Sequence, residues 1–200
     1  MVQVLDMTNN LLGAEHPDTL LSMGNLARTY ADQGKLKEAE QLEVQVLDIT
    51  RKLLGAEHPD TLLSMGNLAV TYSSQGNLKE AEQLGVEVLE MRKKLLGAEH
   101  PSTLLSMENL AITYADQGNS KEAELLIVQV LDLRKKLLGA EHQDTLLSMG
   151  NLARIYFDQG NLNEAGQLEA QMLDMKKKLG GAKHPDALKS MENLVYASNE

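Results

Sequence analysis

The chain has 200 residues, a formal net charge of −10 at pH 7 and no cysteine. The negative charge argues against a nucleic-acid partner, because phosphate contacts favour a basic face, and the missing cysteines exclude disulfides and thiol chemistry. No apolar run approaches the roughly 18–20 residues that span a membrane, and residues 1–12 carry Asp6 but no basic residue, unlike a signal peptide. We expect a cytoplasmic protein.

The chain is a series of near-copies of one 42-residue sequence, and residues 13–54 are identical to residues 55–96 at 32 of 42 positions. A period of this length, built from helical segments, indicates a stacked array in which each repeat packs only on its neighbours. The glycines that open the copies are Gly13, Gly55, Gly97, Gly139 and Gly181.

The expected domain organisation is one repeat array over residues 1–200. Residues 1–12 match the end of a second helix, and residues 181–200 match a first helix, so we expect a piece of a longer protein. The full repeats between these ends are 13–54, 55–96, 97–138 and 139–180.

Each repeat begins with a predicted helix whose apolar residues follow helical spacing. Pro17 is expected at the first helical position and Gly34 at the turn that ends the helix. Tyr72 in the second repeat is expected to pack between its own helix pair and the next. The apolar stripe of the first repeat is Met23, Leu26, Ala27 and Tyr30.

A second helix follows almost at once and stops at Gly55, so the two helices of a pair must be antiparallel. Asn77 and Glu80, three residues apart, predict a capping box at its start, whereas Lys35 in the first repeat is a poorer cap. The other predicted boxes are Asn119 with Glu122 and Asn161 with Glu164. The residues expected to be buried on this helix are Leu36, Ala39, Leu42, Val46, Ile49 and Leu53.

The spacing of Leu26-Ala27, Tyr30, Gly34, Ala39 and Leu47 resembles the tetratricopeptide repeat, and the resemblance covers the whole chain. The segments LGAEHPDTLLSMGNLA and QGKLKEAE are most similar to the long repeats of kinesin light chains and to the repeat tails of fungal and bacterial signalling nucleotidases. The usual period of that family is ~34 residues, so this one is longer, and Arg51 stands where the family has a proline. The resemblance implies an all-α, tetratricopeptide-like α-solenoid: a right-handed superhelix of antiparallel helix pairs, about ten helices in all.

Five histidines share one repeat position. Equivalent positions of stacked helices lie about 10 Å apart, too far for shared metal ligation, so each histidine is expected to be a turn residue before a helix. No phosphate loop or nucleophile motif is present. We therefore predict no catalytic residue, cofactor or metal. The histidines are His16, His58, His100, His142 and His184.

By the same resemblance, the first helices line a concave groove at the positions of Gly24, Asn25, Arg28, Ala31 and Asp32. One position varies in chemistry between repeats and is therefore predicted to be exposed, because an unpaired buried charge is costly. It is occupied by Arg28, Val70, Ile112, Arg154 and Tyr196, and the Ala31 position is Phe157 in the fourth repeat.

A second groove position keeps an amide in every copy. These amides are predicted either to hold an extended peptide backbone, since an amide both donates and accepts, or to bond a neighbouring helix. The sequence leaves both interpretations open. The residues are Asn25, Asn67, Asn109, Asn151 and Asn193.

A third groove position is glycine at Gly24, Gly66 and Gly150 but glutamate at Glu108 and Glu192. A glycine inside a helix costs about 1 kcal/mol relative to alanine, so the glycines need a reason. Since tight helix packing would exclude a glutamate, we predict that the position faces open space. Either drift or the close approach of a partner would then explain the glycines.

The leading functional prediction is a non-enzymatic scaffold that binds a protein or peptide in the concave groove. The alternative is a structural self-association module, a homo-oligomer, favoured by the apolar Val70 and Ile112. The sensor tail of a larger signalling nucleotidase is a further possibility that depends on family likeness alone. End-to-end contacts between copies are predicted at uncovered helices carrying Val4, Met7, Leu188 and Leu194.

Overall fold

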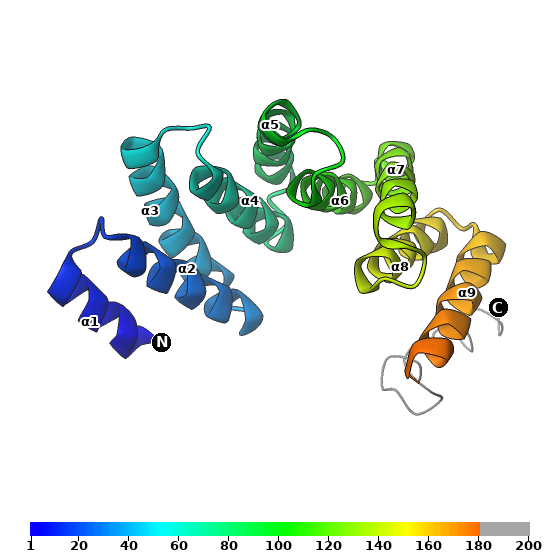
Figure 1. Ribbon diagram of the computed structural model, residues 1–200, viewed down its shortest axis with the longest axis horizontal. Helices are drawn as coiled ribbons and strands as arrows, with labels where there is room; N and C mark the ends of the chain where they lie inside the picture. The colour runs from blue at the N-terminus through cyan, green and yellow to red at the C-terminus, as the bar shows by residue number, and fades with distance from the viewer. Residues whose placement is uncertain (181–200) are drawn as a thin grey trace. The chain divides into compact units, whose positions relative to one another are not determined.

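The computed structural model describes residues 1–180, and all regular secondary structure within them is helical, which confirms the all-α class (Figure 1). The described helices form two compact units, Met1–Ser106 and the residues from Met107 onward. The helices are α1 (Val2–Leu12), α2 (Pro17–Asp32), α3 (Leu36–Leu54), α4 (Pro59–Ser74), α5 (Leu78–Leu96), α6 (Pro101–Asp116), α7 (Ser120–Leu138), α8 (Gln143–Asp158) and α9 (Leu162–Gly180).

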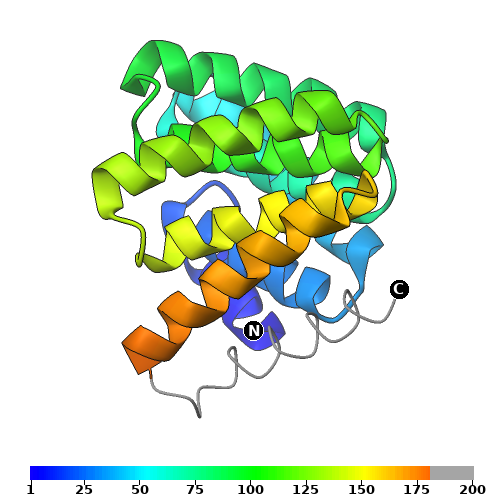
Figure 2. The ribbon, with the colours of Figure 1, turned by 90° about the vertical axis from the view of Figure 1, so that its right-hand side faces the viewer.

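Consecutive helices pack on one another within each unit. In the first unit α2 packs on α1 and α3, and α4 packs on α3 and α5. In the second unit α8 lies between α7 and α9 and contacts both (Figure 2). This sequential packing is that of a repeat solenoid. No helix among residues 1–180 has both the length and the apolar character needed to cross a membrane.

A histidine caps the first helix of each repeat. His16 has an extended backbone, with φ −72° and ψ 139°, and its Nδ1 accepts a hydrogen bond of 3.2 Å from Asp18 N. That bond satisfies one of the free N–H groups at the start of α2. The predicted turn role is thus confirmed for the described copies, while His184 lies outside the described residues. The other capping histidines are His58, His100 and His142.

A left-handed glycine ends each first helix, as predicted. Gly34 has φ 73°, and its N–H donates to Ala31 O over 2.9 Å, while Lys35 N donates to Tyr30 O over 2.9 Å. These two bonds are the Schellman motif and satisfy the last carbonyls of α2. The equivalent glycines are Gly76, Gly118 and Gly160.

The predicted capping boxes of the second helices are wrong. Asn77 makes no side-chain cap, and its Nδ2 donates instead to Gln75 Oε1 over 2.8 Å. The reason lies in the preceding helix, because Asn77 N already donates to Tyr72 O over 2.9 Å. That bond fixes the residue at φ −79° and ψ 60°, away from the extended backbone of a typical N-cap. Asn119 and Asn161 make the same bond to the glutamine two residues before them.

The same glutamine ties consecutive repeats together, a role the sequence analysis did not assign. Gln75 Nε2 donates to Leu36 O over 3.0 Å and to Glu40 Oε2 over 2.8 Å, both on the second helix of the preceding repeat. In the second unit Gln159 Nε2 bonds Ser120 O at 3.2 Å and Glu124 Oε2 at 3.0 Å. Within each unit, the loop between paired helices therefore holds one repeat against the preceding one.

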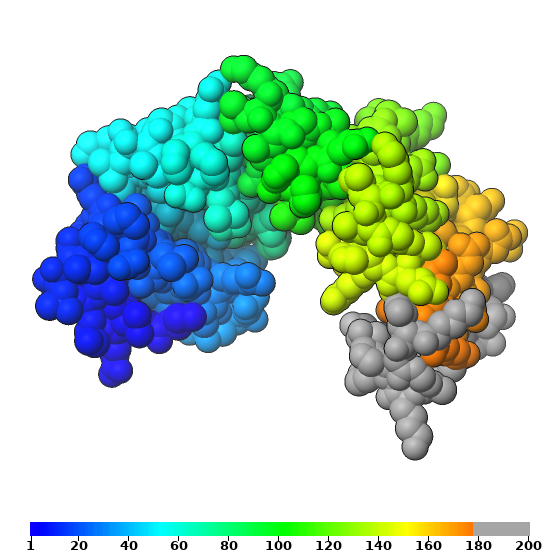
Figure 3. All heavy atoms as spheres, viewed as in Figure 1, coloured from blue at the N-terminus to red at the C-terminus, as the bar shows by residue number. Residues whose placement is uncertain are grey.

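Apolar side chains between the helices form the core of each unit. In the space-filling view the helices of the first unit pack closely against one another (Figure 3). Tyr72 is half-buried in a cluster with residues from α3, α4 and α5. In this cluster it joins its own helix pair to the preceding repeat, whereas the sequence predicted a position against the next repeat. The predicted burial of Leu53 is wrong, since this residue in the last turn of α3 is 46% exposed. The buried cluster of the first unit is Leu47, Leu62, Met65, Leu68 and Val88. That of the second unit is Ala111, Ala123, Ile127, Leu131, Leu146, Met149, Leu152, Ile155 and Met172.

Candidate binding face

One side of each first helix is exposed, and we call this side the first-helix face. On α2 it consists of Leu21, Asn25, Arg28 and Asp32, which are all exposed and follow the spacing of one helix side. Met23 and the other core residues of α2 lie on the buried side. The corresponding residues are Leu63, Asn67, Val70 and Ser74 on α4, Leu105, Asn109, Ile112 and Asp116 on α6, and Leu147, Asn151, Arg154 and Asp158 on α8.

The position that varies in chemistry lies on this face, and its predicted exposure is confirmed for Arg28, Val70 and Arg154. Val70 is an apolar side chain with 44% of its surface exposed. Ile112 is half-buried, and Tyr196 lies outside the described residues. The fold therefore tolerates cationic and apolar side chains here without a change of core packing.

The second unit adds an ion pair and an aromatic ring to this face. Arg154 Nη1 lies 3.3 Å from Asp116 Oδ1, and both side chains are substantially exposed. An exposed pair of this kind contributes only about 0–1 kcal/mol to stability, so both groups remain accessible to a partner. Phe157 is 53% exposed. Aromatic residues and arginines are enriched at the centres of protein interfaces.

The asparagine position behaves differently in different repeats. Asn25 and Asn67 are exposed, whereas Asn109 and Asn151 are half-buried. Asn151 Nδ2 donates a hydrogen bond of 3.0 Å to Glu108 Oε1 on the first helix of the preceding repeat. The bond between neighbouring helices is therefore the better interpretation for Asn151. For Asn25 and Asn67 the contact with a peptide backbone stays a prediction.

The first-helix face also carries a row of exposed leucines that was not predicted from the sequence. Each stands four residues before the asparagine of its helix. Each also directly follows another leucine, which is buried or half-buried. The Leu-Leu pair near the start of each first helix could have indicated this row from the sequence. The core stripe requires only one leucine of the pair, so the other is left exposed. The exposed members are Leu21 at 64%, Leu63 at 52%, Leu105 at 45% and Leu147 at 54%.

The prediction that the Gly24, Gly66, Gly150 and Glu108 position faces open space is wrong for Glu108, which is only 2% exposed. The glutamate is tolerated beside a packed helix because of Arg134 on α7, the second helix of the same repeat. Arg134 Nη1 lies 2.9 Å from Glu108 Oε2. A buried carboxylate is tolerated when it is paired and hydrogen-bonded.

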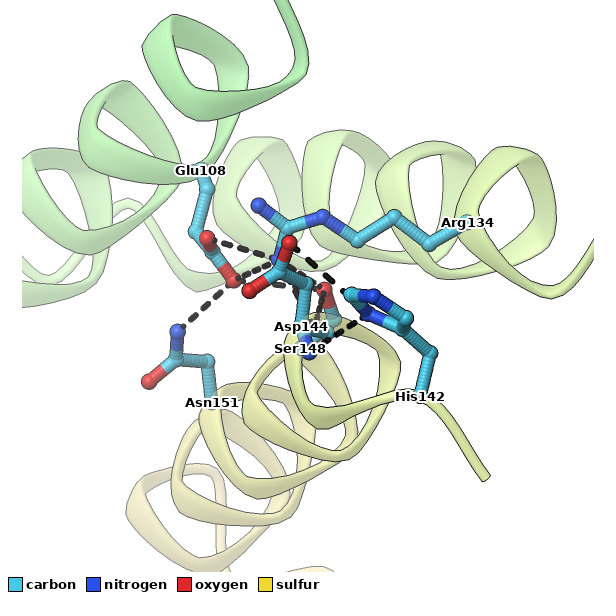
Figure 4. A network of polar contacts seen from close by, with 6 residues as sticks. All are labelled: Glu108, Arg134, His142, Asp144, Ser148 and Asn151. Atoms are coloured by element: carbon cyan, nitrogen blue, oxygen red, sulfur yellow. Dashed lines mark hydrogen bonds and ion pairs between the residues drawn. The ribbon is translucent and has the colours of Figure 1, made fainter. Parts of the chain in front are cut away.

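Glu108 and Arg134 belong to a buried polar network that joins α6, α7 and α8 (Figure 4). Glu108 Oε1 accepts hydrogen bonds from Arg134 Nη1 at 3.0 Å, Ser148 Oγ at 3.2 Å and Asn151 Nδ2 at 3.0 Å. Arg134 Nη1 also donates to Ser148 Oγ over 2.7 Å and to Asp144 O over 2.9 Å. Both charges are therefore compensated inside the second unit.

The first unit has the same arginine without the carboxylate. Arg92, 42 residues before Arg134, is 7% exposed. Its Nη1 donates to Ser102 O over 3.0 Å and to Ser106 Oγ over 2.7 Å, and its Nη2 donates to Leu62 O over 3.2 Å. These acceptors are all neutral, and the glutamate position is occupied by Gly66. Burial lowers the pKa of Arg92.

A second matched position also differs between the units. Glu43 on α3 is 7% exposed, and its Oε2 has no hydrogen-bond partner. Burial raises the pKa of Glu43, a hydrogen bond from Thr71 opposes that rise, and the charge of Glu40 adds to it. In the third and fourth repeats the positions of Glu43 and Thr71 are occupied by Ile127 and Ile155, which are fully buried. The last copy of the glutamate position, Glu169 on α9, again has a buried Oε2 without a partner, and burial raises its pKa.

Within residues 1–180, no three histidine, cysteine, aspartate or glutamate side chains come together in a group that could hold a metal ion. The capping bonds described above occupy Nδ1 of the described histidines.

No curated protein matches this chain. Among solved structures, two crystal structures of putative kinesin light chain TPR-like repeats from Podosopora anserina, with nearly identical repeats, are each 38% identical to it. One has a TM-score of 0.78, and the match covers 92% of this chain and 87% of that chain. The other, a point-substituted form, has a TM-score of 0.73, and the match covers 89% of this chain and 84% of that chain. BtubC (BKLC) from P. vanneervenii shares the fold alone, at 17% identity and a TM-score of 0.80, covering 98% of this chain and 79% of its own.

The family model described as tetratricopeptide repeat matches four consecutive 42-residue units, at residues 19–60, 61–102, 103–144 and 145–186. These units fall on the repeat period found in the sequence and cover most of its length. The chain therefore belongs to the tetratricopeptide repeat family.

Proposed function

We propose that the protein is a non-enzymatic scaffold whose first-helix face binds a protein or peptide segment. The observation that carries the proposal is the row of exposed leucines beside exposed asparagines, at 64% exposure for Leu21 and 52% for Leu63. Burying a leucine side chain contributes about 1.5–3 kcal/mol. The side-chain amides of the adjacent asparagines supply donors and acceptors for the backbone of a partner. The concave groove and a cytoplasmic location stay predictions.

The variation of Arg28, Val70 and Arg154 along the same face supports selectivity. A partner segment crossing α2 and α4 meets a cation on one helix and an apolar group on the next. Such alternation would discriminate between segments by charge and by apolar content. Tetratricopeptide repeat proteins typically act as scaffolds for other proteins, which agrees with this proposal.

The test is capture of peptides from a random display library by the wild-type chain and by two leucine variants. Leu63→Gln removes an exposed leucine from the first-helix face. Leu125→Gln removes one that is 63% exposed on α7, where the equivalent residues of the other repeats are Gln41, Gln83 and Gln167. We expect Leu63→Gln to weaken the selected peptides by about tenfold or more and Leu125→Gln to leave them unchanged. Equal losses, or no capture by the wild type, would reject the proposal.

Self-association is the second candidate, favoured by Val4 and Met7, which are 52% and 62% exposed on α1. Leu188 and Leu194, the other residues of the predicted end-to-end contact, lie outside the described residues. Analytical ultracentrifugation of the wild type and of a Val4→Gln, Met7→Gln variant separates the two candidates. A dimer that dissociates in the variant supports self-association, whereas a monomer at micromolar concentration supports the scaffold.

A further inference from the structure

Arg92 is a buried cation whose surroundings in the first unit contain only neutral acceptors. Nη1 uses both of its hydrogens, on Ser102 O and Ser106 Oγ. Nη2 also carries two hydrogens, and the described contacts give it a single acceptor, Leu62 O. A guanidinium stays charged at neutral pH even when burial lowers its pKa. Arg92 therefore offers an uncompensated positive charge and a remaining donor.

The matched arginine of the second unit shows what completes such a site. Arg134 makes the same serine contact at 2.7 Å that Arg92 makes with Ser106, and a backbone carbonyl accepts from Nη1 at 2.9 Å against 3.0 Å. Its additional partner is a carboxylate, with Glu108 Oε2 at 2.9 Å from Nη1. Figure 4 shows this carboxylate directed at the guanidinium from α6. A carboxylate is thus a ligand that this arrangement of arginine and serine accepts.

At the glutamate position the first unit has Gly66, so no side chain of that residue covers Arg92. A Cβ built on Gly66 would lie 3.8 Å from Arg92 Nη2 and would have no other neighbour within 4 Å. Gly66 is half-buried at the edge of the first-helix face of α4, next to the exposed Leu63 and Val70. A partner that lies along this face would border Gly66, where an added Cβ has only Arg92 Nη2 as a neighbour, 3.8 Å away.

We propose that Arg92 and Ser106, reached past Gly66, bind a carboxylate supplied by a partner on the first-helix face. The proposal rests on the proposed function and names the chemistry that the partner must carry. In the second unit Glu108 supplies this group from within the chain, so the matched site there is already filled. The carboxylate comes either from an acidic side chain or from the C-terminus of the partner.

The experiment follows the Nε–Hε NMR signals of Arg92 and Arg134 in the full chain, assigned with Arg92→Lys and Arg134→Lys variants. Three probes are titrated to millimolar concentration at constant ionic strength: acetyl-Gly-Gly-Glu-Gly-Gly-amide, acetyl-pentaglycine with a free C-terminus, and the Gln form of the first peptide. We expect a saturable shift of the Arg92 signal with one or both carboxylate probes and none with the Gln probe. The probe that acts identifies the source of the carboxylate.

Two variants make the comparison sharper. Gly66→Glu should fill the site from within and weaken the response of Arg92 by about tenfold or more, with circular dichroism unchanged. Glu108→Gly should open the second site, so that Arg134 begins to respond. Failure of all carboxylate probes to move Arg92, or an undiminished response in Gly66→Glu, would overturn the proposal. Peptide capture that survives with a silent Arg92 rejects only the carboxylate site, whereas a responsive Arg92 without capture rejects only the scaffold function.

Discussion

The first unit buries Arg92 among neutral acceptors, whereas the second unit buries Arg134 beside Glu108. The first unit also buries Glu43 against neutral Thr71, where the second unit has Ile127 and Ile155. The second unit pairs its arginine with Glu108 and has Ile127 at one copy of the glutamate position. The other copy in that unit, Glu169, again has a buried Oε2 without a hydrogen-bond partner. The repeat scaffold therefore accepts a charged group at these positions with or without a counter-charge. The arginine position therefore distinguishes the two units, because Arg92 has only neutral acceptors whereas Arg134 has a carboxylate.

The largest effect should come from breaking the pair in the second unit. Glu108→Gly removes the carboxylate and leaves Arg134 buried, and losing one partner of a buried pair costs about 3–5 kcal/mol. Urea unfolding followed by circular dichroism measures the loss. The matched control is the double variant Glu108→Gly, Arg134→Thr, which copies Gly24 and Thr50 of the first repeat and should recover most of the stability. A single-variant cost under ~0.5 kcal/mol would show that the pair is dispensable.

The next effect should come from copying the apolar pair into the first unit. The double variant Glu43→Ile, Thr71→Ile removes a carboxylate with an unsatisfied oxygen and adds the packing seen for Ile127 and Ile155. We expect a gain of about 1–3 kcal/mol in the free energy of unfolding, from the lifted desolvation cost. The single variant Thr71→Ile should instead destabilise, because Glu43 loses its hydrogen bond. A loss of stability in the double variant would contradict this account.

Glu43 should also make the first unit sensitive to pH. Its pKa is raised in the folded state above the ordinary 4.5, so the folded chain binds the proton more tightly than the unfolded chain does. The resulting contribution to stability is complete below pH 4.5 and is lost as the pH rises through the raised folded pKa. Subtracting the pH profile of Glu43→Gln from that of the wild type isolates this contribution. A difference that grows with rising pH in favour of the wild type would contradict the sign.

Filling the carboxylate position of the first unit should stabilise it modestly. Gly66→Glu gains helix propensity and a pair with Arg92, together about 1–2 kcal/mol. Gly24→Glu is the matched control, because Thr50 replaces the arginine there and only the propensity gain of about 0.5–1 kcal/mol remains. Thermal melting compares the two. Equal gains would mean that the carboxylate introduced by Gly66→Glu does not reach the guanidinium.

The smallest effect is expected at the loop of the first repeat. Because the asparagines of the other loops bond a glutamine rather than cap a helix, Lys35→Asn should change stability by less than ~0.5 kcal/mol. It also removes the contact of Lys35 Nζ over the Tyr30 ring, 5.6 Å from its centre. A gain of about 1 kcal/mol in a thermal melt would indicate a true N-cap.

The sequence was sufficient for the fold because the glycine turns and the apolar spacing agree at every repeat. Gly34 needs its left-handed turn, and Met23 and Leu26 face the core, as their positions predict. The N-cap of the second helices was missed because the preceding Schellman turn sets the backbone of Asn77. Propensity at a single position cannot show such a constraint from the neighbouring helix.

The candidate site was only partly predictable. The exposure of Arg28 and Val70 followed from their chemical variation, whereas the burial of Glu108 depends on Arg134, 26 residues away on another helix. A sequence position examined alone does not reveal its counter-charge. The signal was available, since Glu108 and Arg134 are both charged where the first repeat has Gly24 and Thr50.

The most direct test of the comparison is a pair of double-mutant cycles measured by urea unfolding. One cycle combines Gly66→Glu with Arg92→Thr, and the other combines Glu108→Gly with Arg134→Thr. If Arg92 holds the site that Glu108 fills in the second unit, both cycles should give favourable coupling between carboxylate and guanidinium of about 0.5–3 kcal/mol. Coupling at Glu108 and Arg134 together with additive effects at Gly66 and Arg92, within about 0.3 kcal/mol, would contradict the equivalence of the two sites.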